Sequence, residues 1–263
     1  MTSINVRQLV ERLRIIEALA FIPRVSSTNA IGRRVIDECI ENDIPLPSAV
    51  IIAREQFAGR GRGPKSWHSP ADKGIYTTTL HTRPSSELGL LPLEVAVLVA
   101  TFLRETYGVD AQIKWPNDIL VGGKKIAGIL LEARTHHDAA YTLIGIGINI
   151  ERLDANAPAD SISLADISPA ENSVGLDAAT ESFVEFIDRE LSQPMDSQKV
   201  LDAWIRFSVH RPGDRVHCTI GERVVNGTWQ GIDEFGRAVV SEGAGTISIS
   251  GGELVVMNRP RGD

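Results

Sequence analysis

The chain has 263 residues and a mass of 28.6 kDa, and its 43% hydrophobic and 23% charged residues exclude a disordered, collagen-like or coiled-coil protein. The net charge is −7, and two cysteines, Cys39 and Cys218, are too few for a disulfide framework or a four-ligand zinc site. The N-terminus carries regular charges, unlike a signal peptide, and no apolar run approaches about 18 residues, so we expect a cytoplasmic protein without a membrane span.

The first part of the chain predicts helices and strands in mixed order. Apolar residues recur with a helical period over residues 4–20, and Ser26-Ser27-Thr28-Asn29 offers hydroxyl and amide caps before a second helix at 30–41. Residues 44–47 form a connector, 49–53 and 75–80 read as strands, and 92–107 as a long apolar helix. Four more strands follow at 112–115, 119–121, 126–132 and 141–150, with a hairpin turn at Gly122-Gly123.

The pattern of predicted elements in the second part of the chain changes near Arg211. Residues 151–172 predict a loop, and 177–191 and 199–207 predict helices. Short strands separated by glycine turns follow at 215–220, 224–230, 238–241, 246–249 and 254–257, a spacing typical of a small barrel. We therefore expect two domains, residues 1–210 and 211–263. The first lacks regular β-α-β alternation, which favours an α+β fold with a mixed sheet.

The charge is unevenly distributed along the chain. Residues 151–202 carry 12 acids and 3 bases, or −9, so the other 211 residues sum to +2. Within that remainder, residues 59–65 hold three cations and no acid. Such a compact basic loop suits a small anion better than a long nucleic-acid track. A solvated surface loop is the alternative, and the alternation of glycine with arginine argues against it.

This Gly/Arg loop, Gly59-Arg60-Gly61-Arg62-Gly63-Pro64-Lys65-Ser66-Trp67, can bind phosphate, because glycines let backbone amides approach and guanidinium groups pair with phosphate oxygens. It is not a P-loop, because Pro64 stands where the second glycine is needed and removes an amide. A dinucleotide-binding fingerprint fails at the same proline.

Three further segments carry candidate chemistry. Lys114-Trp115-Pro116-Asn117-Asp118 places a cation beside short polar side chains at a strand end, and Lys125 begins an apolar strand in which Ala127-Gly128 leaves room for a ligand. Taken singly, these two segments are equally well explained as a capped turn and a plain hairpin. The alternating glycines of Gly145-Ile146-Gly147-Ile148-Asn149 indicate close approach of a ligand or another backbone.

Together these segments resemble the biotin protein ligase family, the biotin–acetyl-CoA-carboxylase ligases. The matching elements extend over nearly the whole chain and are Ser27-Thr28-Asn29, Gln56 through Trp67, Lys114 through Asp118, Lys125 through Leu130, Gly145 through Asn149, and Gly251-Gly252-Glu253. The resemblance implies a catalytic domain related to class II tRNA synthetases and lipoyl ligases, followed by an SH3-like β-barrel. About 25 residues precede Ser26, too few for the DNA-binding winged helix of some members, so we expect the monofunctional type without DNA binding.

The resemblance also implies an activity and its participants. The family activates biotin with ATP to biotinyl-5′-AMP, releasing pyrophosphate, and then transfers biotin to a lysine of a biotin carboxyl carrier domain. The substrates are ATP and biotin, with Mg²⁺, and the carrier belongs to an acyl-CoA or pyruvate carboxylase. The ligase itself would be a monomer or a homodimer.

The resemblance implies roles for individual residues. Arg60 and Arg62 clamp phosphate and cover the intermediate, Lys125 bridges the biotin carboxylate and the α-phosphate, and Lys114 adds positive charge. Asp118 faces the nucleotide and orients the incoming lysine amine. The remaining implied contacts are to biotin from Ser27, Thr28, Asn29, Gln56, Gly59, Trp67 and Gly128, and to the nucleotide from Asn117 and Asn149.

The sequence departs from the family pattern at several positions. Pro64 and Lys65 replace a second Gly-Arg pair, so the charge is kept while the bidentate fork is lost, and we expect altered retention of the intermediate. Many members of the family have an acidic residue where this chain has Ser26, and some have an aromatic residue near the position of Ser161. An arginine is often present where this chain has Met257, and here Arg259 follows two positions later.

Two other functions compete with biotin ligation. Lipoate ligation shares the fold, but it would lack both the Gly/Arg loop and the Lys-Trp-Pro-Asn-Asp string. A non-enzymatic, biotin-sensing regulator would need a DNA-binding module.

Overall fold

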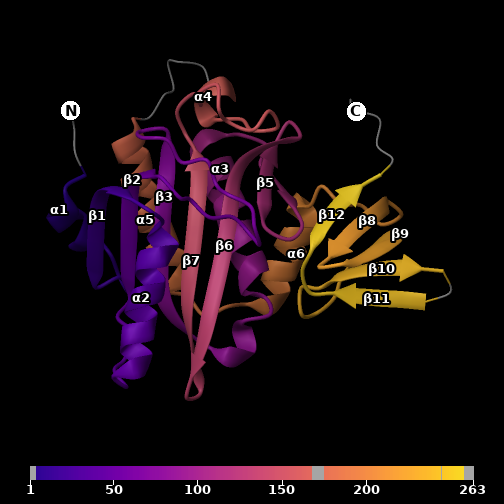
Figure 1. Ribbon diagram of the computed structural model, residues 1–263, viewed down its shortest axis with the longest axis horizontal. Helices are drawn as coiled ribbons and strands as arrows, with labels where there is room; N and C mark the ends of the chain where they lie inside the picture. The colour runs from indigo at the N-terminus through magenta and orange to yellow at the C-terminus, as the bar shows by residue number, and fades with distance from the viewer. Residues whose placement is uncertain (1–3, 168–174, 244, 258–263) are drawn as a thin grey trace.

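Two β-sheets organise the residues that the computed structural model describes, which are 4–167, 175–243 and 245–257 (Figure 1). The larger sheet has the strand order β1-β2-β3-β7-β6-β5-β4. Only β1 and β2 pair in parallel within it, and its other neighbours are antiparallel, so the predicted mixed sheet of an α+β fold is confirmed. Its strands are β1 Ala18–Val25, β2 Ala49–Gln56, β3 Gly74–Pro84, β4 Gln112–Lys114, β5 Asp118–Val121, β6 Lys124–His136 and β7 Ala139–Asn149.

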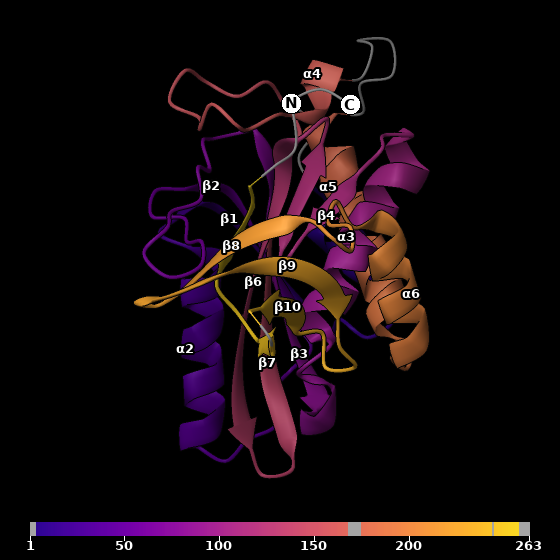
Figure 2. The same ribbon diagram turned by 90° about the vertical axis from the view of Figure 1, so that its right-hand side faces the viewer.

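Helices cover both faces of this sheet. Figure 2 shows α2 (Thr28–Glu41) on one face and α3 (Leu91–Tyr107), α5 (Leu176–Leu191) and α6 (Ser197–Phe207) on the other. The main core lies under α3, where apolar residues on nearly every side of the helix are buried. Two short helices, η1 (Ser85–Glu87) and α4 (Leu164–Ile167), lie in connections. No helix of the described residues is long and apolar enough to cross a membrane.

The predicted helices and strands between residues 28 and 150 are confirmed, with shifts of a few residues at their ends, whereas α4 lies within residues 151–172, which predicted a loop. The two-glycine turn is also confirmed, because Gly122 and Gly123 have φ angles of 57° and 76°, the left-handed values that a two-residue hairpin turn requires. The β6–β7 pairing sets Gly128 opposite Gly147, and the β3–β7 pairing sets Thr78 opposite Gly145. These four residues therefore share the sheet face on which α2 lies.

The helix predicted over residues 4–20 is wrong beyond its first turns. Helix α1 covers only Val6–Val10, and Ala18–Val25 form the edge strand β1. The reason is a distant carboxylate, because Asp188 of α5 accepts hydrogen bonds from the backbone N–H groups of Arg14, Ile15 and Ile16 at 2.5, 3.0 and 2.9 Å. Those amides are therefore not available to extend the helix.

The second sheet has the order β11-β10-β9-β8-β12 and is antiparallel throughout. Its core is continuous with that of the first sheet, since Trp229 packs near Trp204 and the indole N–H of Trp115 donates to the carbonyl of Gly236 at 3.3 Å. The five predicted strands are confirmed as β8 Arg215–Ile220, β9 Arg223–Ile232, β10 Ala238–Glu242, β11 Gly245–Ile249 and β12 Glu253–Val256.

Candidate active site

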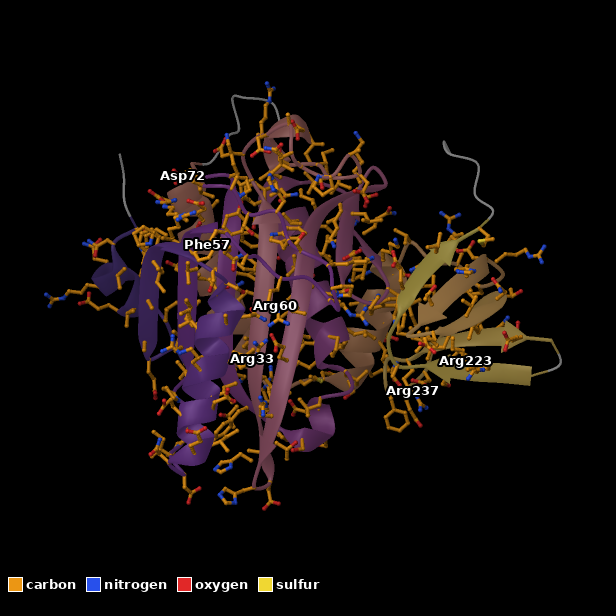
Figure 3. All side chains as sticks on the ribbon, viewed as in Figure 1. Arg33, Phe57, Arg60, Asp72, Arg223 and Arg237 are labelled. Carbon is orange, nitrogen blue, oxygen red and sulfur yellow. The ribbon has the colours of Figure 1, made fainter. Side chains whose placement is uncertain are left out.

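A cavity of about 620 Å³ opens where the α2 face of the large sheet meets the second sheet. The Gly/Arg loop, the start of α2, strands β6 and β7 and the start of β12 line it. Figure 3 shows Arg60 of the loop in front of β6 and β7, near Arg33 of α2. The cavity brings together most of the predicted residues, namely Ser27, Thr28, Asn29, Gln56, Arg60, Arg62, Trp67, Lys114, Asn117, Asp118, Lys125 and Gly128.

One end of the cavity is a neutral polar cluster at the start of α2. The backbone N–H and the hydroxyl of Thr28 donate to Oε1 of Gln56 at 2.8 and 3.2 Å, and Nε2 of Gln56 donates to Oγ of Ser69 at 3.0 Å. Oγ1 of Thr78 lies 2.7 Å from Oγ1 of Thr28 and 2.6 Å from Oδ1 of Asn29. These bonds fix which end of the Gln56 amide is the donor and hold the cluster rigid.

The polar side chains that begin α2, those of Thr28 and Asn29, bind within this cluster and do not cap the helix, so the predicted side-chain caps are wrong. Ser27 occupies the N-cap position, yet its side chain makes no capping hydrogen bond. Nδ2 of Asn29 donates to Oε1 of Glu132 at 3.2 Å, and Arg33 forms a short ion pair with the same carboxylate. Burial opposes ionisation of Glu132, but the bonds from Arg33 and Asn29 outweigh it and lower its pKa. Glu132 therefore remains an acceptor that orients Asn29.

Trp67 forms a wall that depends on glycines in the sheet. A β-carbon on Gly147 would lie 2.2 Å from Nε1 of Trp67, and one on Gly128 would lie 2.9 Å from its ring. A β-carbon on Gly145 would lie 2.1 Å from Oδ1 of Asn29. The alternating glycines predicted close approach of a ligand or another backbone. The groups that approach them are instead the side chains of the cavity itself.

An ion pair lies beside this wall. Nζ of Lys125 is 2.5 Å from Oδ1 of Asp118, and both side chains are about one-quarter exposed, at 28% and 27%. The same ammonium stands 5.2 Å from the centre of the Trp67 ring, a cation–π distance. The backbone of Lys125 is fixed by bonds to Asp160 (2.7 Å) and Ile162 (3.0 Å). Lys125 is thus positioned at both its main chain and its charged end.

The Gly/Arg loop is folded against the second sheet. Within the loop the N–H of Gly61 donates to the carbonyl of Lys65 at 2.8 Å. Arg62 donates to the carbonyl of Gly252 at 3.2 Å, and Nζ of Lys65 lies 2.8 Å from Oε1 of Glu253. Burial lowers the pKa of Arg62, and the hydrogen bond from Lys65 lowers the pKa of Glu253. The loop therefore forms part of the cavity lining and is bound to the start of β12.

Two predicted residues do not line the cavity. A β-carbon on Gly59 would lie 2.4 Å from the carbonyl oxygen of Trp67, so glycine is needed where the two arms of the loop meet. Asn149 is buried, and its Nδ2 donates to the carbonyl of Ile162 at 3.1 Å. Asn117 does line the cavity, but its amide nitrogen is bound to the carbonyl of Ile129.

At the departures near the end of the chain, the side chain of Met257 is exposed and Arg259 lies outside the described residues.

Sequence reasoning missed three residues that shape the site. Thr78 lies in a run of threonines that predicted only a strand, and Glu132 stood at the end of an apolar strand. Strand alternation could have placed Thr78 on one face, but only the packing of α2 shows which face. Glu253 was part of a matching motif without a role, because its partner Lys65 is 188 positions earlier in the sequence.

Comparison with known proteins agrees with this arrangement. Residues 21–149 match the biotin/lipoate A/B protein ligase family, and residues 213–257 match the biotin protein ligase C terminal domain. A biotin–acetyl-CoA-carboxylase ligase from Paracoccus denitrificans is 30% identical over 223 residues, which cover 79% of this chain and 90% of that protein. The chain belongs to the biotin/lipoate A/B protein ligase family.

Other members of the family match over shorter or more divergent stretches. The bifunctional ligase/repressor BirA of Bacillus subtilis is 36% identical over 130 residues, so the match spans only 39% of its length and 48% of this chain. The biotin protein ligase from Aquifex aeolicus, solved in complex with biotin and ATP, superposes with a TM-score of 0.64 at 23% identity, covering 91% of this chain and 98% of that one. This last likeness is one of fold.

Proposed function

We propose that this protein is an ATP-dependent biotin protein ligase. In the first step a carboxylate oxygen of biotin attacks the α-phosphorus of ATP, and the bond to the pyrophosphate leaving group breaks, giving biotinyl-5′-AMP. In the second step the amine of a carrier lysine attacks the acyl carbon, AMP leaves, and the amine loses a proton. The carrier would be a biotin carboxyl carrier domain of an acyl-CoA or pyruvate carboxylase.

The observation that carries the proposal is the charge of the cavity lining. Among its described residues are five cations, Arg60, Arg62, Lys65, Lys114 and Lys125, and two carboxylates, Asp118 and Glu253, each held by a lysine. The first step brings one anion against a polyanion, and fixed cations at that point stabilise the charge that develops. A neutral polar cluster at the other end suits an uncharged cyclic urea.

On the biotin side, Gln56, Thr28, Ser27 and Asn29 would bind the ureido ring and Trp67 would cover it. The preset hydrogen bonds of Gln56 support this role, because a rigid amide loses little entropy when it binds. Gly128 would leave room for the acyl chain beside Lys125.

On the phosphate side, the Lys125–Asp118 pair supports two linked roles. Lys125 would exchange Asp118 for the biotin carboxylate and the α-phosphate, which leaves the Asp118 carboxylate free. A free carboxylate there could accept a hydrogen bond from the incoming lysine amine and orient it. Arg60, Arg62 and Lys114 would hold the remaining phosphate oxygens, while Asn117 would face the nucleotide.

Two of the predicted residues do not line the cavity, and we propose that they act indirectly. Gly59 would act by letting the loop close, and Asn149 would act by holding residues 160–162 against Lys125.

Magnesium would enter as part of the substrate MgATP. Mg²⁺ is usually held by one or two carboxylates together with substrate phosphates, and the two carboxylates among the described lining residues match that pattern rather than a preformed cage.

We also propose that residues 1–210 form the catalytic domain, related to class II synthetases, and residues 211–263 an SH3-like domain. We propose that the protein is a monomer or a homodimer.

The test is pyrophosphate release from ATP by the purified protein. Release should depend on biotin and should not rise with lipoate. Lys125→Ala should lower the biotin-dependent rate at least 100-fold, the range for removing one charged stabilising group. If lipoate replaces biotin in the assay, the protein belongs to the lipoate branch, and if Lys125→Ala retains normal release, Lys125 does not contact the reacting groups.

A further inference from the structure

A cluster of metal-binding side chains lies at the opposite end of α2 from the cavity. His136 ends β6, His137 follows it in the turn before β7, and Asp43 follows the end of α2. Figure 1 places the hairpin tip and this end of α2 together at the bottom of the molecule, far from the second sheet. The 14 residues of α2, Thr28–Glu41, correspond to about 20 Å of helix, so the cluster is separate from the site described above.

The three side chains converge on one point. Nε2 of His136 lies 3.1 Å and Nε2 of His137 lies 2.9 Å from the same oxygen, Oδ1 of Asp43, and one ligand atom from each residue lies within 4.8 Å of the others. Among the described residues, this is the one group of three or more His, Cys, Asp or Glu side chains that meets that distance.

Part of the cluster is rigid before any ion arrives. The side chain of His136 is 15% exposed, and its ring packs 5.4 Å from the ring of Tyr141, whose hydroxyl donates to the carbonyl of Ile44 at 3.3 Å. The side chains of His137 and Asp43 are 72% and 75% exposed. An ion from solvent can therefore reach the cluster, and only the two exposed side chains would need to move.

The donor set has the chemistry of a borderline divalent metal. Two imidazole nitrogens and one carboxylate oxygen suit Zn²⁺, which binds them at about 2.0–2.2 Å in a tetrahedron. Such a tetrahedron separates its donors by roughly 3.3 Å, a few tenths of an ångström more than the two N–O distances here. Simple hydrogen bonds from two histidines to one aspartate are the competing explanation, and they would leave no affinity for a metal.

We propose that Asp43, His136 and His137 bind one Zn²⁺ ion, with water at the fourth position. The ion would join the end of α2 to the β6–β7 hairpin, two segments about 93 positions apart in the sequence that meet at this point. The role is structural, because the cluster lies away from the reacting groups.

The experiment is calorimetric titration of the untagged full chain, first treated with a chelator, with ZnCl₂, supported by thermal unfolding with and without zinc. We expect one equivalent to bind and the melting temperature to rise. His137→Ala and Asp43→Ala should each weaken binding at least tenfold and abolish the rise. His217→Ala is the matched control, because this histidine lies in the second sheet beside Asn226 and should leave both readouts unchanged.

The absence of saturable binding to the wild type would overturn the proposal, and so would equal binding by wild type, His137→Ala and Asp43→Ala. Folding of the variants is checked by biotin-dependent pyrophosphate release, which all three should retain. That readout also separates failure of the zinc site from failure of the proposed ligase function.

Discussion

Adding one methyl group at Gly147 tests whether the bare sheet face sets the position of Trp67. In Gly147→Ala the new β-carbon would lie 2.2 Å from Nε1 and 2.5 Å from Cε2 of the indole. An ordinary contact needs about 3.4 Å or more, so the ring must move by about 1.2 Å. The sheet is fixed by pairing on both sides of β7, so the ring must move toward the cavity, where it would narrow the space for biotin.

The size of the effect follows from two opposing terms. Overpacking a well-filled site costs typically about 1–3 kcal/mol, and replacing glycine by alanine in a strand returns about 0.5–1 kcal/mol. We therefore expect a loss of up to about 2.5 kcal/mol in the free energy of unfolding. If the ring relieves the clash by entering the cavity, biotin binding weakens by a similar or somewhat larger amount, which raises the KM for biotin about 10-fold while the KM for ATP changes little.

The assay is biotin-dependent pyrophosphate release at varied biotin and at varied ATP, with urea unfolding in parallel. Gly245→Ala is the matched control, because Gly245 lies in β11 and its β-carbon would find no atom closer than 3.9 Å. A KM for biotin within twofold of wild type, at unchanged stability, would refute the reasoning. It would mean that Trp67 does not form the wall of the biotin site.

The other predictions concern the loop and one partly buried histidine. Arg62→Gly should let biotinyl-5′-AMP escape and label bystander lysines, and labelling confined to the carrier would show that Arg62 does not retain the intermediate. Glu253→Gln should change the free energy of unfolding by no more than about 1 kcal/mol, because both side chains of the Glu253–Lys65 ion pair are more than half exposed. The same variant should raise bystander labelling up to about fivefold. Unchanged labelling would mean that this contact does not hold the loop closed. Burial lowers the pKa of His81 to about 4, and repulsion from Arg83 adds to the shift, so the unfolded chain binds more protons at His81 between about pH 6.5 and 4. The contribution of His81 to the free energy of unfolding is complete above pH 6.5 and is lost as the pH falls. Across this window the wild type should therefore lose up to about 3 kcal/mol more of its free energy of unfolding than His81→Gln does, as measured by urea unfolding. Parallel pH profiles of the two proteins would contradict the lowered pKa of His81.

The elements that the sequence predicted well are those whose cause is local. Helix α3 is apolar on nearly every side, and the turn at Gly122-Gly123 requires left-handed backbone that glycine adopts freely. The failed helix at residues 4–20 has a distant cause, because the carboxylate of Asp188 takes the amides that would continue it. A period of apolar residues carries no information about such a partner.

The residues of the site also divide into those that the sequence identified and those that depend on distant partners. Residue type and spacing, taken together with the resemblance to the biotin protein ligase family, identified Arg60, Lys125 and Asp118 as candidates. They did not identify Glu132 or Thr78, which act on Asn29 across the gap between α2 and the sheet. Only the packing of that helix on β3 and β7 brings these three residues together.

The departure at Lys65 has a physical reason in the contact of this residue with the second sheet. A guanidinium fork is useful where two oxygens of one group must be bound in a plane, whereas an ammonium is a compact charge that needs a single near oxygen. Lys65 meets one carboxylate oxygen of Glu253, so the ammonium is sufficient for the contact that is present. Arg62, the loop cation that reaches the carbonyl of Gly252 beside it, keeps the guanidinium and is the more buried of the two. The two cations of the loop therefore make different contacts: Lys65 ties the outer arm of the loop to β12, and Arg62 binds the carbonyl of Gly252. Under the proposed function Arg62 would exchange that carbonyl for a phosphate oxygen.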